Sequence, residues 1–177
     1  MNSNNLILYK LIILYMLDRV DFPLTNAQLS QFIIDRGYTT FFNLQEAIHQ
    51  LIDDEFISST TIRNTSHYQS TPKGREALAF FENKLSEGIK QDILNFFKEE
   101  KINLKNEVDL LADYYPTSRG EYTVVCTIND RGDTVLELKM NVPSKDQAIA
   151  ICDAWPEKST TTYQYLLKNL WFEESGS

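Results

Sequence analysis

The sequence has little of what metal sites, disulfide frameworks and nucleotide-binding loops require. Its 177 residues include only two cysteines, two histidines and six glycines. Cys126 and Cys152 lie far apart without metal-ligand spacing, so we interpret them as small buried hydrophobes, with a disulfide as the alternative. His49 and His67 have no clustered cysteine or carboxylate ligands, and no glycine-rich loop precedes a helix. We therefore expect no metal, no cofactor and no catalytic residue, and we predict that the protein is not an enzyme.

Long apolar runs are also scarce, and the main candidate is Leu6–Leu17. This run is shorter than the ~20 residues that span a bilayer, and Lys10 lies inside it. Asp18 and Arg19 follow it, where a signal peptide would have small residues at a cleavage site. We predict no membrane association and a cytoplasmic protein. The run then forms a helix that is buried by its own domain or by a second subunit.

Positive charge is in short supply. The formal net charge is −8, and residues 1–71 carry four basic and seven acidic side chains. Strong, non-specific DNA binders present a broad positive field, and this composition excludes such a field. A local basic patch would still be enough for a sequence-specific DNA-binding protein.

The first half of the chain predicts three helices, a hairpin and a further helix. The first helix runs from about Asn5 to Val20. Thr25 begins the second helix as the N-cap of a capping box with Gln28, and Gly37 ends it. A third helix runs from Thr39 or Thr40 to about Asp54. Two strands follow, Phe56–Ile62 and His67–Thr71, joined by the turn Arg63–Ser66, and a fourth helix begins at Thr71-Pro72. This order is typical of a winged helix-turn-helix domain.

One stretch carries a family resemblance. YQSTPKGREAL, from Tyr68 to Leu78, resembles the place where the second wing strand meets the next helix in many bacterial winged-helix regulators. The positions that match this pattern are Tyr68, Thr71, Gly74 and Leu78. Upstream, the residues that resemble the usual third helix and first wing strand are Leu44, Ala47, Ile48, Leu51 and Phe56-Ile57, with Glu55 where the usual glycine would stand. The resemblance covers residues 5–85.

The second half of the chain changes its hydrophobic period. Ser86 is predicted to cap an amphipathic helix that reaches Asn103, which we interpret as core or as a dimer seam. From about Lys105 a period of two, which starts with Val108, Leu110 and Ala112, predicts a three-stranded antiparallel meander, with a hairpin turn at the sequence NDRGD. Ser144 begins a helix, Pro156 stops it, and a last helix follows.

These elements predict an α+β fold with three parts. They are an N-terminal winged helix (residues 1–85), an amphipathic linking or dimerisation helix (86–105), and a C-terminal α+β domain of three strands and two helices (106–177). As a whole, the chain resembles an uncharacterised family of bacterial winged-helix proteins with an appended C-terminal domain. That family is known by sequence far better than by activity, so the expectation of a transcriptional regulator comes from the winged-helix order and the Tyr68–Leu78 stretch.

The third helix is the predicted DNA-reading element, although residues 39–57 contain no lysine or arginine. At 100° per residue its core face carries Phe41, Leu44, Ile48, Leu51 and Ile52. Its opposite face carries Phe42, Asn43, Glu46, His49, Gln50 and Asp53, with Gln45 on the flank. Asparagine and glutamine can pair with adenine in the major groove. The helix can therefore read bases, but it cannot supply the electrostatic affinity.

The predicted DNA-binding residues fall into two groups. Base reading is assigned to Asn43, Gln45 and His49. Phosphate contact is assigned to helix N-termini at Thr25, Asn26, Thr39 and Thr40, and to Arg63, Asn64, Lys73 and Arg75 at and after the wing. Lys73 and Arg75 have solvated surface as their alternative role. Three cations imply a salt slope of about −3 per monomer and about −5 to −6 per dimer.

We predict a sequence-specific, homodimeric regulator that binds a two-fold symmetric site in double-stranded DNA, with the two third helices about 34 Å apart. The alternative is a winged helix used for protein contact, which the outward Phe42, Glu46 and Asp53 favour. A further hypothesis is an unidentified small-molecule effector, held by C-terminal aromatic residues: Tyr114, Tyr115, Tyr122, Trp155, Tyr163, Tyr165, Trp171 and Phe172. The acidic residues Asp109, Asp113 and Glu121 are interpreted as solvated strand edges, with the lining of a pocket as the alternative.

Overall fold

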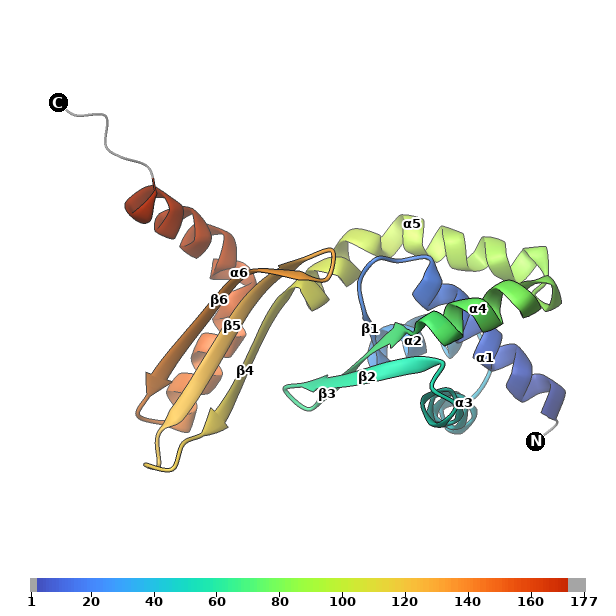
Figure 1. Ribbon diagram of the computed structural model, residues 1–177, viewed down its shortest axis with the longest axis horizontal. Helices are drawn as coiled ribbons and strands as arrows, with labels where there is room; N and C mark the ends of the chain where they lie inside the picture. Colours follow the sequence, from blue (N-terminus) through green and yellow to red (C-terminus); the bar gives the residue numbers. More distant parts are fainter. Residues whose placement is uncertain (1–2, 172–177) are drawn as a thin grey trace. The chain divides into compact units, whose positions relative to one another are not determined.

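A computed structural model describes residues 3–171, apart from the side chains of residues 101–103 and 106. Within this range the fold is α+β, with six α-helices, one 3₁₀ helix and two three-stranded antiparallel sheets. The chain divides into two compact units, residues 1–108 (unit 1) and residues 109–177 (unit 2), and each unit contains one of the sheets (Figure 1). Phe172 lies outside the described residues.

Unit 1 is mainly helical. Its helices are α1 (Ser3–Asp18), α2 (Asn26–Ile33), α3 (Phe41–Asp53), α4 (Pro72–Phe81), the 3₁₀ helix η1 (Glu82–Lys84) and α5 (Glu87–Asp109). The predicted capping box is confirmed, because the Thr25 side chain accepts from the Gln28 amide and the Gln28 side chain accepts from the Thr25 amide. Gly37 closes a Schellman-type end to α2 at a φ of +76°, with the Tyr38 amide donating to the Ile33 carbonyl oxygen.

Helix α1 is the centre of the unit 1 core. Every residue from Leu11 to Leu17 is buried, and α1 packs against α3, α4 and the strand β3 (Thr65–Ser70). The apolar run is therefore covered within its own unit, which is one of the two coverings that the sequence left open. No helix in the described part of the chain has both the length and the hydropathy needed to cross a membrane.

The sheet of unit 1 has the order β1-β3-β2, with β1 at Leu24–Thr25 and β2 at Ile57–Ile62. The predicted four-residue turn between β2 and β3 is wrong, because Ile62 pairs directly with Thr65. Arg63 and Asn64 form a two-residue turn at φ values of +48° and +60°, as a type I′ hairpin requires. Strand β1 was not predicted, since its two residues pair only with a strand more than forty residues away.

Helix α5 is longer than predicted. Ser86 caps it as expected, with its Oγ accepting from the Ile89 amide at 3.2 Å. The prediction that Val108 belongs to a strand is wrong, because α5 continues to Asp109. The interpretation of Asp109 as a solvated strand edge is wrong as well, because Asp109 is buried at the end of α5. Val108 and Leu104 are both buried in the unit 1 core. Residues four apart share one face of a helix, so alternating apolar residues at this point were compatible with either period.

Tyr38 and Phe32 connect α2 and its following turn to α5. The Phe32 ring lies 5.3 Å from the ring of Phe96. The Tyr38 hydroxyl donates to the Asp92 carboxylate at 2.5 Å. Burial, together with this hydrogen bond, raises the pKa of Tyr38 to about 12. Helix α5 is thus a structural part of unit 1.

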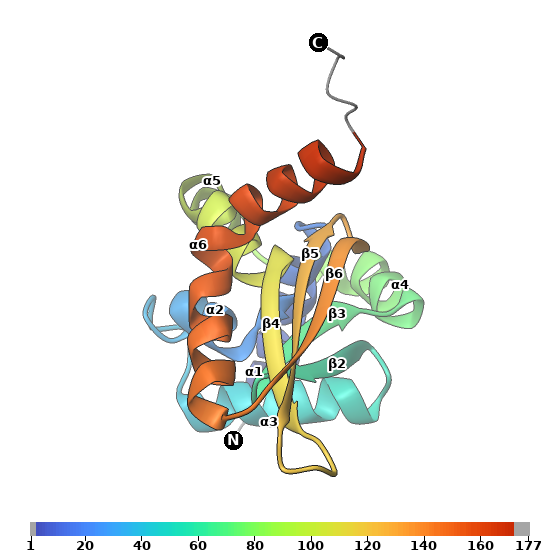
Figure 2. The same ribbon diagram turned by 90° about the vertical axis from the view of Figure 1, so that its left-hand side faces the viewer.

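Unit 2 is a three-stranded meander covered by one helix. Its elements are β4 (Leu110–Pro116), β5 (Tyr122–Asp130), β6 (Asp133–Val142) and α6 (Lys145–Leu170), with sheet order β4-β5-β6. The meander and the capping box of Ser144 with Gln147 are both confirmed. Helix α6 lies against one face of the sheet (Figure 2), where Cys126 on β5 and Cys152 on α6 are buried and are not joined by a disulfide. Burial raises the pKa of the Cys126 thiol to about 11.

The prediction of two C-terminal helices separated at Pro156 is wrong. Helix α6 is continuous and contains Pro156 in its interior. Proline lacks an amide hydrogen and therefore removes one backbone hydrogen bond, which bends a helix when its flanking turns are held in place. The preceding turn is held by Trp155, whose ring is buried and whose Nε1 donates to the Thr127 carbonyl oxygen at 2.9 Å. Figure 2 shows α6 changing direction along its length.

Candidate nucleic-acid interface

The N-terminus of α3 is fixed by its cap. Thr40 has an extended backbone, and its side chain accepts from the Asn43 amide at 3.4 Å. The Asn43 side chain in turn donates to the Thr39 hydroxyl at 3.0 Å. Thr39, Thr40 and Asn43 are therefore brought together at one end of α3. The first turn of a helix has backbone amides without partners inside the helix, and such amides attract anions.

A network of amide groups holds α3 against α2. Asn26 Nδ2 donates to Gln45 Oε1 at 2.9 Å, and Gln45 Nε2 donates back to Asn26 Oδ1 at 3.0 Å. Asn26 Nδ2 also lies 3.3 Å from the hydroxyl of the buried Tyr68. Asn26 and Gln45 satisfy one another, so the structure gives both residues a role in positioning α3. Thr25 is buried, and its side chain and amide are used in the capping box.

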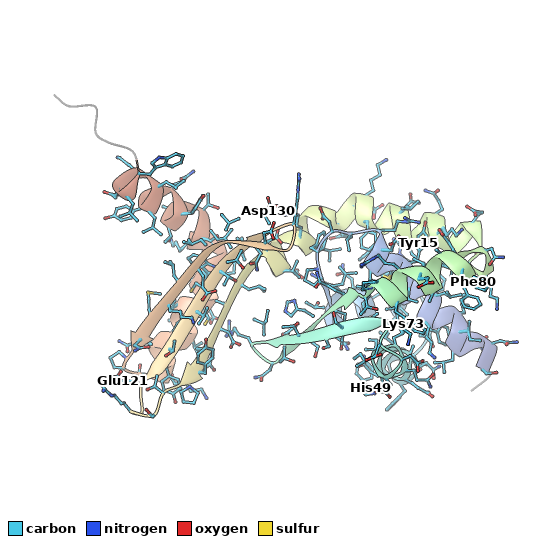
Figure 3. The ribbon with its side chains drawn as sticks, viewed as in Figure 1. Tyr15, His49, Lys73, Phe80, Glu121 and Asp130 are labelled. Atoms are coloured by element: carbon cyan, nitrogen blue, oxygen red, sulfur yellow. The ribbon has the colours of Figure 1, made fainter. Side chains whose placement is uncertain are left out.

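The outer face of α3 is polar and acidic, with aromatic residues at its start. His49 is exposed on this face, and Figure 3 labels it on α3. Phe42 is 83% exposed, as predicted for the outward side. The placement of Phe41 in the core is wrong, because it is 56% exposed and its ring lies 6.2 Å from that of Phe42. The core face of α3 is instead completed by Ala47.

The matching residues of the YQSTPKGREAL stretch have a common structural role. Thr71 Oγ1 donates to the Glu55 carbonyl oxygen at 2.6 Å and accepts from the Gly74 amide at 3.1 Å. A Cβ atom on Gly74 would lie only 2.0 Å from the Phe56 carbonyl oxygen, so only glycine allows this approach. Glu55 occupies its corner at a φ of +61°. A non-glycine residue at this positive φ costs about 1–2 kcal/mol.

The predicted cations lie around this corner and at the hairpin tip. Lys73 Nζ donates to the Asp54 carbonyl oxygen at 2.8 Å and lies 5.1 Å from the Phe56 ring centre (Figure 3). The Arg75 guanidinium donates to the Ser70 carbonyl oxygen at 3.1 Å. Both side chains are exposed, so each keeps further donors toward solvent. Arg63 and the exposed Asn64 lie in the hairpin turn.

The structure does not gather all predicted residues at one point. Lys73 contacts the carbonyl at the end of α3, whereas Thr39, Thr40 and Asn43 lie at its beginning. An α-helix of this length spans about 18 Å. A ligand that met both groups would have to extend along the whole of α3, as a DNA backbone or groove does.

Buried polar groups near the sheet do not form a metal centre. Burial lowers the pKa of His67, whose Nδ1 has no hydrogen-bond partner among the described residues. Across residues 3–171 no cluster of three or more His, Cys, Asp or Glu side chains is placed to hold a metal ion. His67 is therefore a buried side chain of the central strand β3.

Comparison with known proteins gives one match. The model of the family described as Domain of unknown function (DUF4364) matches residues 9–170, a range that extends across both compact units. No curated protein and no solved structure matches the chain significantly.

Proposed function

The chain belongs to the family described as Domain of unknown function (DUF4364), and from that premise we propose that unit 1 is a winged helix-turn-helix which binds specific sites in double-stranded DNA. In this proposal the chain is a homodimeric transcriptional regulator. Helix α3 enters the major groove, and the β2–β3 hairpin is the wing. Two α3 helices then read half-sites about 34 Å apart.

The pairing of α2 with α3 is the main support for this proposal. The reciprocal amide contacts between Asn26 and Gln45 fix the two helices, while His49 on the outer face of α3 stays exposed. A recognition helix needs this combination, because its partner helix must be rigid and its outer face must be free. The order of three helices followed by a hairpin adds to that support.

The distribution of charge defines how such binding would behave. Helix α3 has no lysine or arginine, so the positively charged contacts to phosphate come from Arg63, Lys73 and Arg75. With three cations per subunit, the logarithmic salt slope is about −5 to −6 for a dimer. Affinity therefore depends on two subunits that bind together and on moderate salt.

The test is recovery of sheared genomic DNA by purified protein at about 50 mM and about 200 mM salt. We expect a few fragments that share a two-fold motif to be enriched at the lower salt and lost at the higher salt. Arg63→Ala should reduce the salt slope by about one per subunit. Arg131→Ala is the matched control, because Arg131 also lies at positive φ in a hairpin turn, but in unit 2. Absence of enrichment at the lower salt would overturn the proposal.

A second candidate function is protein contact through α3, and one observation favours it. Phe41 and Phe42 form an exposed aromatic pair next to the acidic outer face of α3. Phe42→Ala should then weaken a partner interaction in a pull-down without changing the melting temperature. Phe80→Ala is the matched control, since Phe80 is also exposed and paired with a neighbouring phenylalanine. Equal capture by the wild type and the Phe42→Ala variant would exclude this function.

A further inference from the structure

A second feature of unit 1 lies away from the outer face of α3. Two adjoining hollows, of about 200 and 270 Å³, lie along α1 and share Ile7, Leu11 and Lys84 as lining residues. The first also reaches Ala77 on α4 and is lined almost entirely by apolar atoms. We refer to the two hollows together as the α1–α4 groove. The second hollow has a mixed polar and apolar lining, so the apolar surface of the groove lies mainly along the first. Concave apolar surface beside a few polar groups is typical of small-molecule sites.

The charges of the groove all have one sign. Its only charged lining residues are Lys10 and Lys84, and within residues 3–171 no carboxylate lines either hollow. Lys84 Nζ lies 5.0 Å from the centre of the Phe81 ring, which is itself part of the lining. Neither lysine forms a salt bridge with any carboxylate that the structure describes. The groove therefore offers apolar surface together with two ammonium groups that no carboxylate in the described part of the chain neutralises.

We propose that the α1–α4 groove binds a free fatty acid of medium chain length. The alkyl chain lies along Leu11, Leu14 and Ala77, where it removes apolar surface from water. The carboxylate lies at Lys84, which lines both hollows, with Lys10 as the second cation. A charge-assisted hydrogen bond to a lysine fixes the direction in which the chain enters.

The same observations argue against the other occupants. A second copy that packed symmetrically over the groove would bring its lysines toward those of the first, and like charges oppose association. A peptide in extended conformation needs a strand edge to pair with, whereas the residues of the groove come mainly from α1 and α4, whose backbone is already paired within the helices. Nucleic acid would meet apolar side chains where its phosphates need donors.

The groove also reaches α3. Leu51 in the last turns of α3 and Phe56 just after it line the same hollow as Ala77. If α3 binds DNA, a fatty acid in the groove contacts the C-terminal end of α3 and can regulate that binding. This regulatory role rests on the proposed function. The binding site itself does not, because it can be measured without DNA.

Calorimetric titration of the full chain with decanoate, below its micelle concentration, tests the site. We expect saturable binding of one equivalent. Decyltrimethylammonium has the same tail with the opposite charge and should bind at least tenfold more weakly. Equal binding of the two, or a titration that never saturates, would mean that only non-specific adsorption occurs and would overturn the proposal.

Substitutions then locate the site. Lys84→Met should weaken decanoate binding about tenfold, as expected for loss of one charge-assisted hydrogen bond, while Lys98→Met on the exposed side of α5 should leave it unchanged.

A second variant fills the hollow. Ala77→Phe should abolish decanoate binding while the circular dichroism spectrum stays that of the wild type. If this variant does not fold, the Lys84→Met result decides. Unchanged affinity in both variants refutes the location. Binding of an acidic amphipathic helical peptide without decanoate binding would identify a protein partner and overturn the fatty acid proposal.

Discussion

The two compact units bury apolar side chains in different ways. Among the described residues of unit 1, twenty-six form one buried cluster around α1, which other elements cover on most sides. Among those of unit 2, six buried residues lie between one face of a sheet and one helix. Since hydrophobic stabilisation grows with the apolar area removed from water, unit 1 has the larger reserve of stability. A function that needs a rigid helix pair is better placed on unit 1, and easier local opening is expected in unit 2.

The largest effect is expected from Phe32→Ala in unit 1. Phe32 is fully buried, and loss of its ring should lower the free energy of unfolding by about 3–5 kcal/mol. Both tryptophans of the sequence, Trp155 and Trp171, belong to unit 2, so their fluorescence reports that unit while far-ultraviolet circular dichroism reports both. The circular dichroism transition of the variant should move to lower urea concentration, and the midpoint of its fluorescence transition should stay unchanged. Phe42→Ala is the exposed control, with a change within about 0.5 kcal/mol. Coincident transitions in the Phe32→Ala variant would show that the two units unfold together and not separately.

A backbone contact gives the next largest effect. Gly74→Ala would place a Cβ atom against the Phe56 carbonyl oxygen, and we expect a loss of about 1–3 kcal/mol or more in thermal unfolding. Gly88→Ala is the matched control in the first turn of α5, where the nearest atom is 3.9 Å away. There an added methyl group should stabilise the helix by about 0.5–1 kcal/mol. Changes of the same sign in the two variants would contradict a tight approach at Gly74.

In unit 2 the informative change is Cys126→Ser. The Cys126 side chain is fully buried beside α6, and a hydroxyl placed there without a partner costs about 1–3 kcal/mol. This loss should appear in the tryptophan fluorescence transition, which reports unit 2. Cys126→Ala keeps the site apolar and separates the polar effect from the loss of volume. If serine is tolerated better than alanine, the interpretation of Cys126 as a small hydrophobe fails.

The smallest effect is a pH dependence that belongs to unit 1. Burial lowers the pKa of His67 below its ordinary value of 6.5, so the unfolded chain binds a proton on this side chain that the folded chain does not. His67 therefore favours folding above pH about 6.5, and this stability is lost as the pH falls from about 6.5 toward the lowered pKa. His67→Gln should reduce the loss in urea titrations monitored by circular dichroism, whereas His49→Gln, on the exposed face of α3, should not. An identical pH profile for the wild type and the His67→Gln variant would disprove this.

The local parts of the fold could be predicted from the sequence. Thr25, Thr40, Thr71 and Ser144 cap helices as expected, because a cap depends on residues within three positions of one another. The three-stranded meander followed from alternation and from its turn residues. Strand β1 could not be predicted, since its pairing with β3 depends on distant residues. Val108 was assigned to the wrong element, because its burial depends on the core of unit 1.

The candidate site was predicted in residue type more than in role. The positions on α3 that face outward followed from the helical period, apart from Phe41, which begins the helix and lies beyond the packed turns. Asn26 and Gln45 have the right chemistry for DNA contact, but the structure joins them to each other across nineteen positions of sequence. No spacing rule connects two such residues before the tertiary fold is known. The α1–α4 groove was not predicted for the same reason.

The buried helix α1 has a consequence for how the protein is made. Its covering elements α3, β3 and α4 all follow it in the chain, the last of them ending at Phe81. At a synthesis rate of about 5–20 residues per second, several seconds separate the completion of α1 from that of α4. During this interval the cover of α1 is incomplete, because α3 is already present but α4 is not. Apolar side chains of α1 are therefore exposed to the surroundings of the nascent chain before the unit 1 core can close.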